Sequence, residues 1–187
     1  MGKLIMWNLI TLDGYFEGEK NWDLSFHETV WGPELEKFSL EQLNSASHLV
    51  FGRVTYEGMA AYWKTAKGED EGIAGLMNSL PKIVCSKTLD SVDWNNTTLI
   101  KGNVAKEIAA LKTKSDKDLY VFGSANLSET FIREDLFDEY RIAIAPVITG
   151  KGRHLFQKGF PEKKLSLLSS RPLQTGGVVL TYKSLSV

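Results

Sequence analysis

The sequence HLVFGRVTYE at residues 48–57 joins a strand-like apolar run to a helix-like run through a single glycine. The sequence DLYVFGSANL at residues 118–127 repeats this arrangement. The first turn of a helix has backbone N–H groups without intrahelical partners and a partial positive charge, and glycine lets a phosphate approach that backbone closely. Two such junctions therefore predict a ligand with several phosphates, for example a dinucleotide.

Arg53 directly follows the first glycine. Its planar guanidinium can form bidentate, charge-assisted hydrogen bonds with a further terminal phosphate of such a ligand. The alternative is a structural turn in which Arg53 pairs with a surface carboxylate. At the second junction, Ser124 and Asn126 could simply cap a helix, because both residue types are common caps.

The composition is that of an ordinary globular protein, with 187 residues, 43% of them hydrophobic, and a formal net charge of -1. The length favours one domain over residues 1–187. The balanced charge argues against nucleic acid or an anionic membrane as a partner. The single cysteine, Cys85, excludes an intramolecular disulfide and argues against a structural zinc site, so we expect no metal.

The compartment is predicted from the same features. A chain with one cysteine suits the reducing cytoplasm. The first residues lack the length and small-residue exit of a signal peptide, and no run approaches the roughly 18 apolar residues of a membrane helix. We therefore expect a soluble cytoplasmic protein.

Strand-like and helix-like runs alternate over the first two thirds of the chain, with a charged loop expected at residues 64–70. The expected strands are 4–12, 49–51, 82–85, 97–100 and 119–122, and the expected helices are 34–43, 54–63, 72–80, 104–111 and 125–133. A strand at 138–148 follows, and residues 165–170 and 178–182 are typical of an antiparallel hairpin. This pattern predicts an α/β fold with one mixed sheet covered by helices.

Six segments occur in an order typical of one protein superfamily. They are TLDGYF at 11–16, GRVTYEGM at 52–59, KIVCSKTL at 82–89, VFGSANL at 121–127, LFDEY at 136–140 and PVITGKGRHLF at 146–156. The chain resembles the dihydrofolate reductase-like superfamily, and especially stand-alone proteins related to the reductase (C-terminal) domain of the bifunctional riboflavin-biosynthesis deaminase/reductase. The resemblance implies a single dihydrofolate reductase-like domain of three layers with a central mixed, mostly parallel sheet. It also implies NADPH as cofactor and a homodimer.

The resemblance also assigns cofactor contacts to particular positions. These are Gly52, Arg53 and Thr55 for the adenosine phosphates, Ser86, Lys87 and Thr88 for the adenosine half, Gly123, Ser124, Ala125, Asn126 and Leu127 for the pyrophosphate, and Leu12, Asp13 and Gly14 near the nicotinamide.

Two departures from the family pattern bear on the substrate. Dihydrofolate reductases keep a carboxylate on the helix after the first loop, where this chain has His27. The riboflavin-type reductase usually has Glu-Gly-Gly where this chain has Phe122, Gly123 and Ser124. Neither folate nor the ribosylaminopyrimidine is therefore the expected substrate.

Four residues are candidates for the reacting centre and its substrate. Asp13 is the ionisable group expected nearest to that centre, and the alternative is a plain turn residue before Gly14. His27 is a candidate proton donor because histidine titrates near neutrality, and the alternative is a solvated loop residue. Trp22 and Trp31 are candidates to stack on a flat heterocycle, although most tryptophans belong to a core.

The sequence predicts an NADPH-dependent reductase that transfers a hydride to the C=N or C=O carbon of a small planar heterocycle or related carbonyl compound. One alternative is a non-catalytic nucleotide-binding or sensing protein on the same fold, because a fold does not fix a function. Another is a structural dimer whose cofactor site has decayed.

Overall fold

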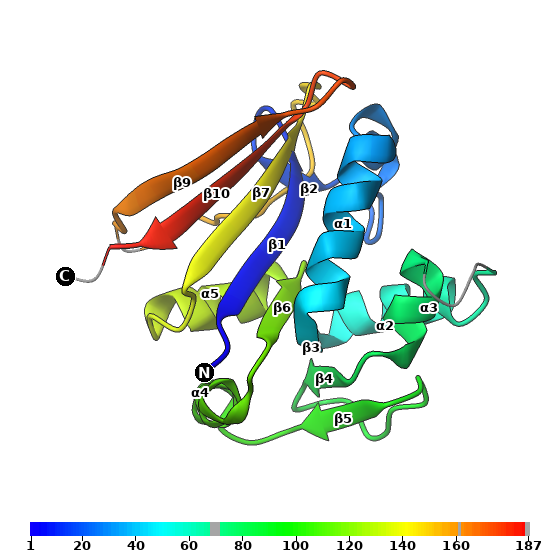
Figure 1. Ribbon diagram of the computed structural model, residues 1–187, viewed down its shortest axis with the longest axis vertical. Helices are drawn as coiled ribbons and strands as arrows, with labels where there is room; N and C mark the ends of the chain where they lie inside the picture. The colour runs from blue at the N-terminus through cyan, green and yellow to red at the C-terminus, as the bar shows by residue number, and fades with distance from the viewer. Residues whose placement is uncertain (68–71, 161, 186–187) are drawn as a thin grey trace.

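The computed structural model describes residues 1–67, 72–160 and 162–185. These residues form an eight-stranded sheet with the order β5-β4-β3-β6-β1-β7-β10-β9 (Figure 1). Its strands are β1 (Leu4–Thr11), β3 (Ala46–Gly52), β4 (Lys82–Cys85), β5 (Thr97–Ile100), β6 (Asp118–Phe122), β7 (Glu139–Ala145), β9 (Leu165–Pro172) and β10 (Val178–Ser184). Two short strands, β2 (Tyr15–Glu17) and β8 (Arg153–His154), pair separately.

Neighbouring strands are parallel from β5 to β7, and β10 is antiparallel to both β7 and β9. The expected mixed, mostly parallel sheet and its C-terminal hairpin are confirmed. The parallel strands have buried, nearly continuous apolar runs, as expected for strands that are covered on both faces.

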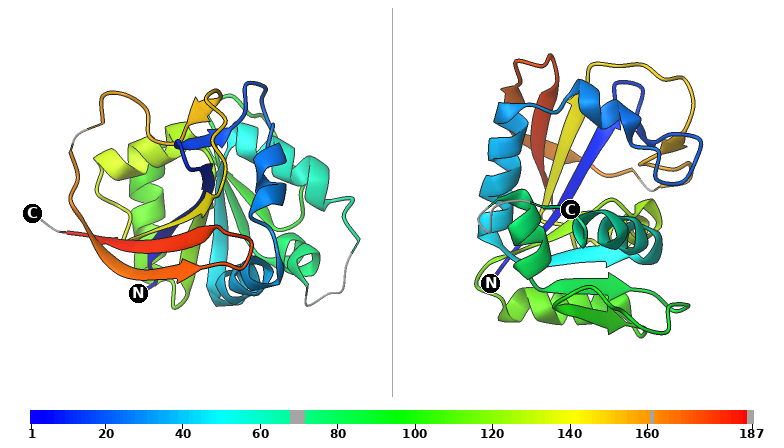
Figure 2. Two further views of the ribbon diagram at one scale, coloured as in Figure 1. Left: turned by 90° about the horizontal axis from the view of Figure 1, so that it is seen from above. Right: turned by 90° about the vertical axis from the view of Figure 1, so that its right-hand side faces the viewer.

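Helices cover the two faces of this sheet, giving the expected three layers (Figure 2). One face packs against α1 (Pro33–Ser45), α2 (Arg53–Trp63) and α3 (Ile73–Ser79), and the other against α4 (Val104–Lys114) and α5 (Ala125–Arg133). Alternate residues of β1 follow this division, because successive strand side chains point to opposite faces. Ile5 and Trp7 join the first core cluster, and Leu4 and Met6 join the second.

Each helix begins within one residue of its predicted start, but α1 and α4 continue to Ser45 and Lys114, beyond their predicted ends at 43 and 111. Pro33 is the first residue of α1, a position where its missing N–H costs nothing. Leu35, Phe38 and Leu43 are buried on one face of that helix, as their spacing predicts. The segment 17–33 is a loop with one 3₁₀ turn, Ser25–Thr29. Of the loop expected at 64–70, residues 68–70 lie outside the described residues.

The strand expected at 138–148 is shorter, because β7 ends at Ala145. Pro146 has no N–H to donate to a neighbouring strand, and the chain turns there with Val147 N bonded to Ala145 O. In the described part of the chain, no helix is both long enough and apolar enough to span a membrane.

Candidate functional site

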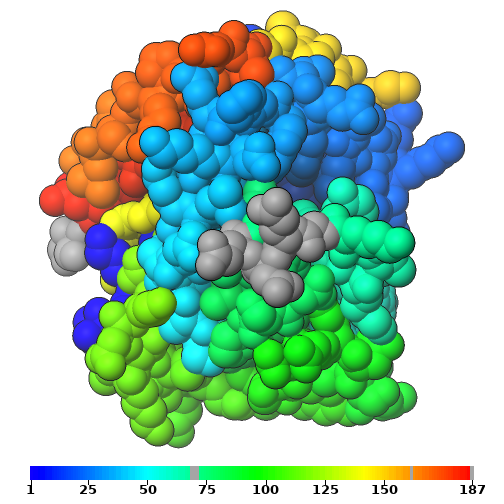
Figure 3. Space-filling view, turned by 45° about the vertical axis from the view of Figure 1, so that its right-hand side comes forward, coloured from blue at the N-terminus to red at the C-terminus, as the bar shows by residue number. Residues whose placement is uncertain are grey.

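A cavity of about 1030 Å³ opens at the carboxyl ends of the parallel strands, where α/β sheets usually bind ligands. Its rim consists of the segments that follow β3, β4, β5 and β6, namely residues 52–55, 86–88, 101–105 and 123–127, which we call the junction edge. The cavity continues between the sheet and helices α1 to α3. This part is lined by Trp7, Leu9, Gln42, Leu43, Met59 and Met77, among others, and we call it the inner lobe. Figure 3 shows the face on which α1 lies beside α2 and α3.

The two glycine junctions predicted to bind phosphates touch each other. Ser124 Oγ accepts a hydrogen bond from Gly52 N at 2.8 Å and lies 2.7 Å from Thr55 Oγ1. Gly123 has a φ of 57°, and a Cβ there would lie 3.2 Å from the Thr55 side chain. The positive φ and this close approach favour glycine at position 123, and the contact brings the start of α2 beside the start of α5.

The first turns of α2 and α5 carry no side-chain cap. The alternative that Ser124 and Asn126 only cap a helix is therefore wrong, because Ser124 is bonded to Gly52 and Asn126 Oδ1 accepts from Arg153 Nη2 at 2.8 Å. Helix α4 differs, since the Asn103 side chain caps it by accepting from Lys106 N. The N–H groups that begin α2 and α5 remain available to an anion.

Several basic side chains line the cavity, among them Arg53 and Lys87 of the junction edge, and Arg153. Arg53 pairs with Glu57 at 3.0 Å, one helical turn away, so the predicted surface pairing is present. Both side chains are nearly half exposed, and exposed pairs of this spacing contribute only about 0.3–0.5 kcal/mol. The guanidinium can therefore exchange Glu57 for a phosphate at little cost.

The segment after β4 also lines the cavity. Ser86 Oγ accepts hydrogen bonds from Thr88 N at 3.2 Å and Leu89 N at 3.0 Å, which closes the turn that presents Lys87. Burial raises the pKa of the Cys85 thiol to about 12, so this residue is a buried, unreactive side chain.

Leu12 and Asp13, expected near the nicotinamide, are not among the residues that line the cavity. Leu12 is 62% exposed. Asp13 accepts hydrogen bonds from Thr11 Oγ1 at 2.6 Å and Gly150 N at 2.7 Å, and these bonds lower the pKa of its carboxyl group. The structure thus gives Asp13 the contacts of a turn residue, which was its alternative interpretation.

His27 lines the cavity, but its electrostatic state differs from the expectation. Burial lowers the pKa of its imidazole to about 4, so His27 is neutral at pH 7. The expectation of titration near neutrality is wrong, because the sequence does not reveal how deeply the ring is buried. A neutral imidazole can still donate or accept a hydrogen bond there.

Trp22 and Trp31 both line the cavity. The Trp22 ring packs against helix α2, and a Cβ at Gly58 would lie 2.4 Å from it. One face of the Trp22 ring is therefore covered by protein. Trp31 is 45% exposed.

Three further polar residues, none of them predicted from the sequence as site residues, also line the cavity. Glu17 is buried, accepts from Trp22 N at 2.5 Å and lies 3.9 Å from Arg153. Asn8 is 4% exposed and Gln42 is 2% exposed, and their amide nitrogens have no hydrogen-bond partner among the described residues. Asn8 interrupts an apolar strand and Gln42 lies on the apolar face of a helix, which is the signal that could have identified them.

The family described as RibD C-terminal domain matches residues 2–179. The chain belongs to this family. It is also 30% identical over 184 residues to the uncharacterized protein YyaP of Bacillus subtilis (strain 168), and the match covers 96% of this chain and 94% of YyaP.

Solved structures share the fold of this chain. A putative riboflavin biosynthesis protein from Shewanella sp. PV-4 has a TM-score of 0.81 and 24% identity, with 98% of this chain and 99% of that chain covered. Dihydrofolate reductase from Enterococcus faecalis, solved with NADP(H) and RAB-propyl, has a TM-score of 0.65 and 17% identity, with 99% and 98% covered. These likenesses show the fold, so the predicted dihydrofolate reductase-like architecture is confirmed.

Proposed function

We propose that this protein is an NADPH-dependent reductase of a small planar heterocycle or related carbonyl compound. The observation that carries the proposal is the contact between its two glycine junctions. Through Ser124, the uncapped starts of α2 and α5 lie together at the rim of one cavity. This is the arrangement that a ligand with several phosphates requires.

The residues present fit NADPH. The first turns of α2 and α5 would bind its phosphates, residues 86–88 would contact the adenosine half, and Arg53 would bind the 2′-phosphate. The unpartnered amide nitrogen of Asn8 offers a further donor in the same cavity. Bound NADPH would supply a hydride, and the protein would supply position and a dry environment.

The inner lobe is where a substrate would lie beside the cofactor. Its tryptophan, methionine and leucine side chains exclude water and offer flat apolar surface. The buried carboxylate of Glu17 is held by Trp22 N and faces Arg153, and His27 is neutral. We therefore assign proton supply to water rather than to a side chain of this lining.

The chain also fits a homodimer in a reducing, cytoplasmic compartment, on the family resemblance and the single cysteine. At the edge of the sheet, β9 exposes Leu167 at 53% and Leu168 at 50%. Unpaired edge strands with exposed apolar side chains are sites of association. Sedimentation equilibrium tests this assignment, and a mass equal to one chain at micromolar concentration rejects it.

The reductase proposal is tested by following NADPH oxidation in the presence of pterins, pyrimidines and quinones. We expect consumption of NADPH with at least one of these classes, and slower consumption in the Gly123→Ala variant. NADPH binding without consumption by any class would favour a nucleotide-binding or sensing protein. Absence of binding would favour a decayed site.

A further inference from the structure

Gln42 is a buried amide on the apolar face of α1. It lies among Leu35, Phe38 and Leu43, is 2% exposed and lines the inner lobe. Its Nε2 has no hydrogen-bond partner among the described residues. Leaving a buried donor unpaired costs about 1–3 kcal/mol, so a ligand that brings an acceptor to this nitrogen would recover free energy that the described residues do not supply.

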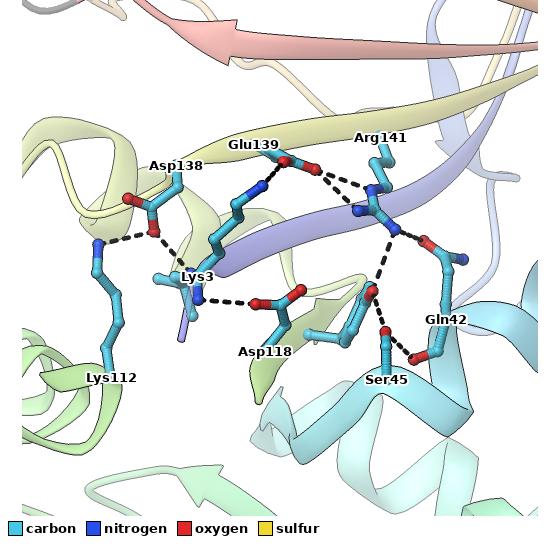
Figure 4. Close-up of polar contacts among 10 residues, drawn as sticks. Lys3, Gln42, Ser45, Lys112, Asp118, Asp138, Glu139 and Arg141 are labelled. Carbon is cyan, nitrogen blue, oxygen red and sulfur yellow. Dashed lines mark hydrogen bonds and ion pairs between the residues drawn. The ribbon is translucent and has the colours of Figure 1, made fainter. Parts of the chain in front are cut away.

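The orientation of this amide is set by Arg141. A guanidinium has donors only, so it must face the oxygen of the amide, and Arg141 Nη1 donates to Gln42 Oε1 at 3.3 Å. Arg141 is in turn held by Glu139 Oε2 at 2.8 Å and by Tyr120 Oη at 3.1 Å. Figure 4 shows the Gln42 nitrogen turned away from Arg141. Nε2 is therefore a fixed donor directed away from the ion pair.

This donor lies at the far end of the inner lobe from the junction edge. Strand β1 runs toward the junction edge. Trp7 precedes Leu9 by two residues on this strand and therefore lies about 7 Å further from that edge. Trp7 is opposite Arg141 in the sheet register and so shares its face with the side chain that holds Gln42. A ligand that enters from the junction edge would reach Gln42 with its leading end.

The Glu17 carboxylate is held by Trp22 N and faces Arg153. Among the described residues, the rest of the inner lobe offers no charge to a ligand. Its lining on the α1 to α3 side consists of tryptophan, leucine, isoleucine and methionine side chains with Ser39 and Gln42, in the part of the chain that the structure describes. His27, which also lines the cavity, is neutral at pH 7. Ser39 Oγ is bonded to Leu35 O. A charged group placed here would lose its hydration without a counter-charge, which costs several kcal/mol.

We propose that the inner lobe binds an uncharged planar ring compound that carries a carbonyl oxygen, and that Gln42 Nε2 donates a hydrogen bond to that oxygen. Gln42 is thus a specificity-determining residue. That this ligand is the substrate of the reductase rests on the proposed function. Binding itself requires only the geometry of the lobe.

The test compares three probes by isothermal titration calorimetry on the full chain at pH 7.5. Coumarin is uncharged and has a carbonyl, naphthalene is a flat hydrocarbon without one, and coumarin-3-carboxylate carries a charge. We expect coumarin to bind at least tenfold more tightly than either of the others. Equal binding of coumarin and naphthalene, or no binding of any probe, would overturn the proposal.

Variants separate the donor from general packing. In Gln42→Met the preference for coumarin over naphthalene falls below threefold, while naphthalene binds as before. Gln42→Glu retains an oxygen for Arg141 but replaces the donor by an acceptor, so we expect it to lose the preference for coumarin as well. This variant remains informative if Gln42→Met does not fold. Ser39→Ala, one turn away on the same helix, keeps the preference. Retention of the preference in both Gln42 variants would refute the assignment.

NADPH titration of the same samples keeps this inference separate from the reductase proposal. One outcome is that the Gln42 variants lose the coumarin preference while the protein fails to bind NADPH. That result supports the proposed ligand binding in the inner lobe and refutes the reductase proposal. NADPH binding without a preference for coumarin supports the reductase proposal and refutes the role assigned to Gln42 in the inner lobe.

Discussion

Ser124 Oγ accepts the backbone N–H of Gly52 at 2.8 Å and so joins two glycine junctions that lie 72 residues apart in the chain. The same oxygen lies 2.7 Å from Thr55 Oγ1 in the first turn of α2. One hydroxyl group therefore sets the distance between two helix N-termini. If each N-terminus binds a phosphate, this hydrogen bond fixes the spacing between the phosphates.

Ser124→Ala should both destabilise the protein and weaken NADPH binding. Gly52 N loses its acceptor in a partly buried position, so we expect the free energy of unfolding to fall by about 1–3 kcal/mol. Urea denaturation measures this change, and titration calorimetry measures the affinity. Ser169→Ala, at an exposed position on β9, should change stability by less than about 0.5 kcal/mol and leave affinity unchanged. Equal effects of the two variants would refute the role of Ser124.

Gly123→Ala and Gly150→Ala form a matched pair. Both glycines have positive φ, 57° and 68°, and an alanine in this region costs about 1–2 kcal/mol. A Cβ at Gly123 would lie 3.2 Å from Thr55, whereas no atom of the described residues lies within 4 Å of one at Gly150. We expect both variants to lose stability in urea, but only Gly123→Ala to bind NADPH at least tenfold more weakly. Weakening by both would point to a general loss of folding instead.

Arg53→Ala should distinguish the two nicotinamide cofactors. The loss of a charged hydrogen-bond partner for the 2′-phosphate should weaken NADPH binding by about 1.5–3 kcal/mol and leave NADH binding unchanged. Arg133→Ala is the control, because Arg133 forms an i,i+4 pair with Glu129 just as Arg53 does with Glu57. Calorimetry that shows the same NADPH affinity for wild type and Arg53→Ala would remove Arg53 from the site.

The free energy of unfolding should depend on pH through the titration of His27. The pKa of its imidazole is about 4 in the folded protein and 6.5 when exposed, so between these values the unfolded chain binds a proton that the folded chain does not. The free energy of unfolding should therefore fall as the pH is lowered from about 6.5 to about 4, by on the order of 2 kcal/mol from this residue. Urea denaturation at several pH values measures it, and His27→Gln should flatten the profile. Parallel profiles for wild type and variant would contradict the burial of His27.

The order of strands and helices could be predicted from the sequence because it depends on local signals. These signals are the apolar periodicity, Pro33 at a helix start and the glycines after β3 and β6. Each of them determines the structure of only the few residues around it. The end of β7 was missed only because Pro146 was included in an apolar run.

The site was predicted in part, and the limit is physical. The junction segments line the cavity as expected, since a strand end and a helix start are local features. Burial is not local, so neither the pKa of His27 nor the missing partner of Gln42 could be deduced from neighbouring residues. Asp13 has the residue type of a catalytic acid, yet it accepts hydrogen bonds from Thr11 Oγ1 and from Gly150 N, and the second comes from a loop far along the chain.

The most direct test of the reductase assignment is equilibrium binding of NADPH, followed by quenching of the tryptophan fluorescence and repeated with NADH. Trp7, Trp22, Trp31 and Trp63 line the cavity and should report a bound nicotinamide. We expect a micromolar dissociation constant for NADPH and at least tenfold weaker binding of NADH. Binding of neither cofactor would contradict the reductase assignment.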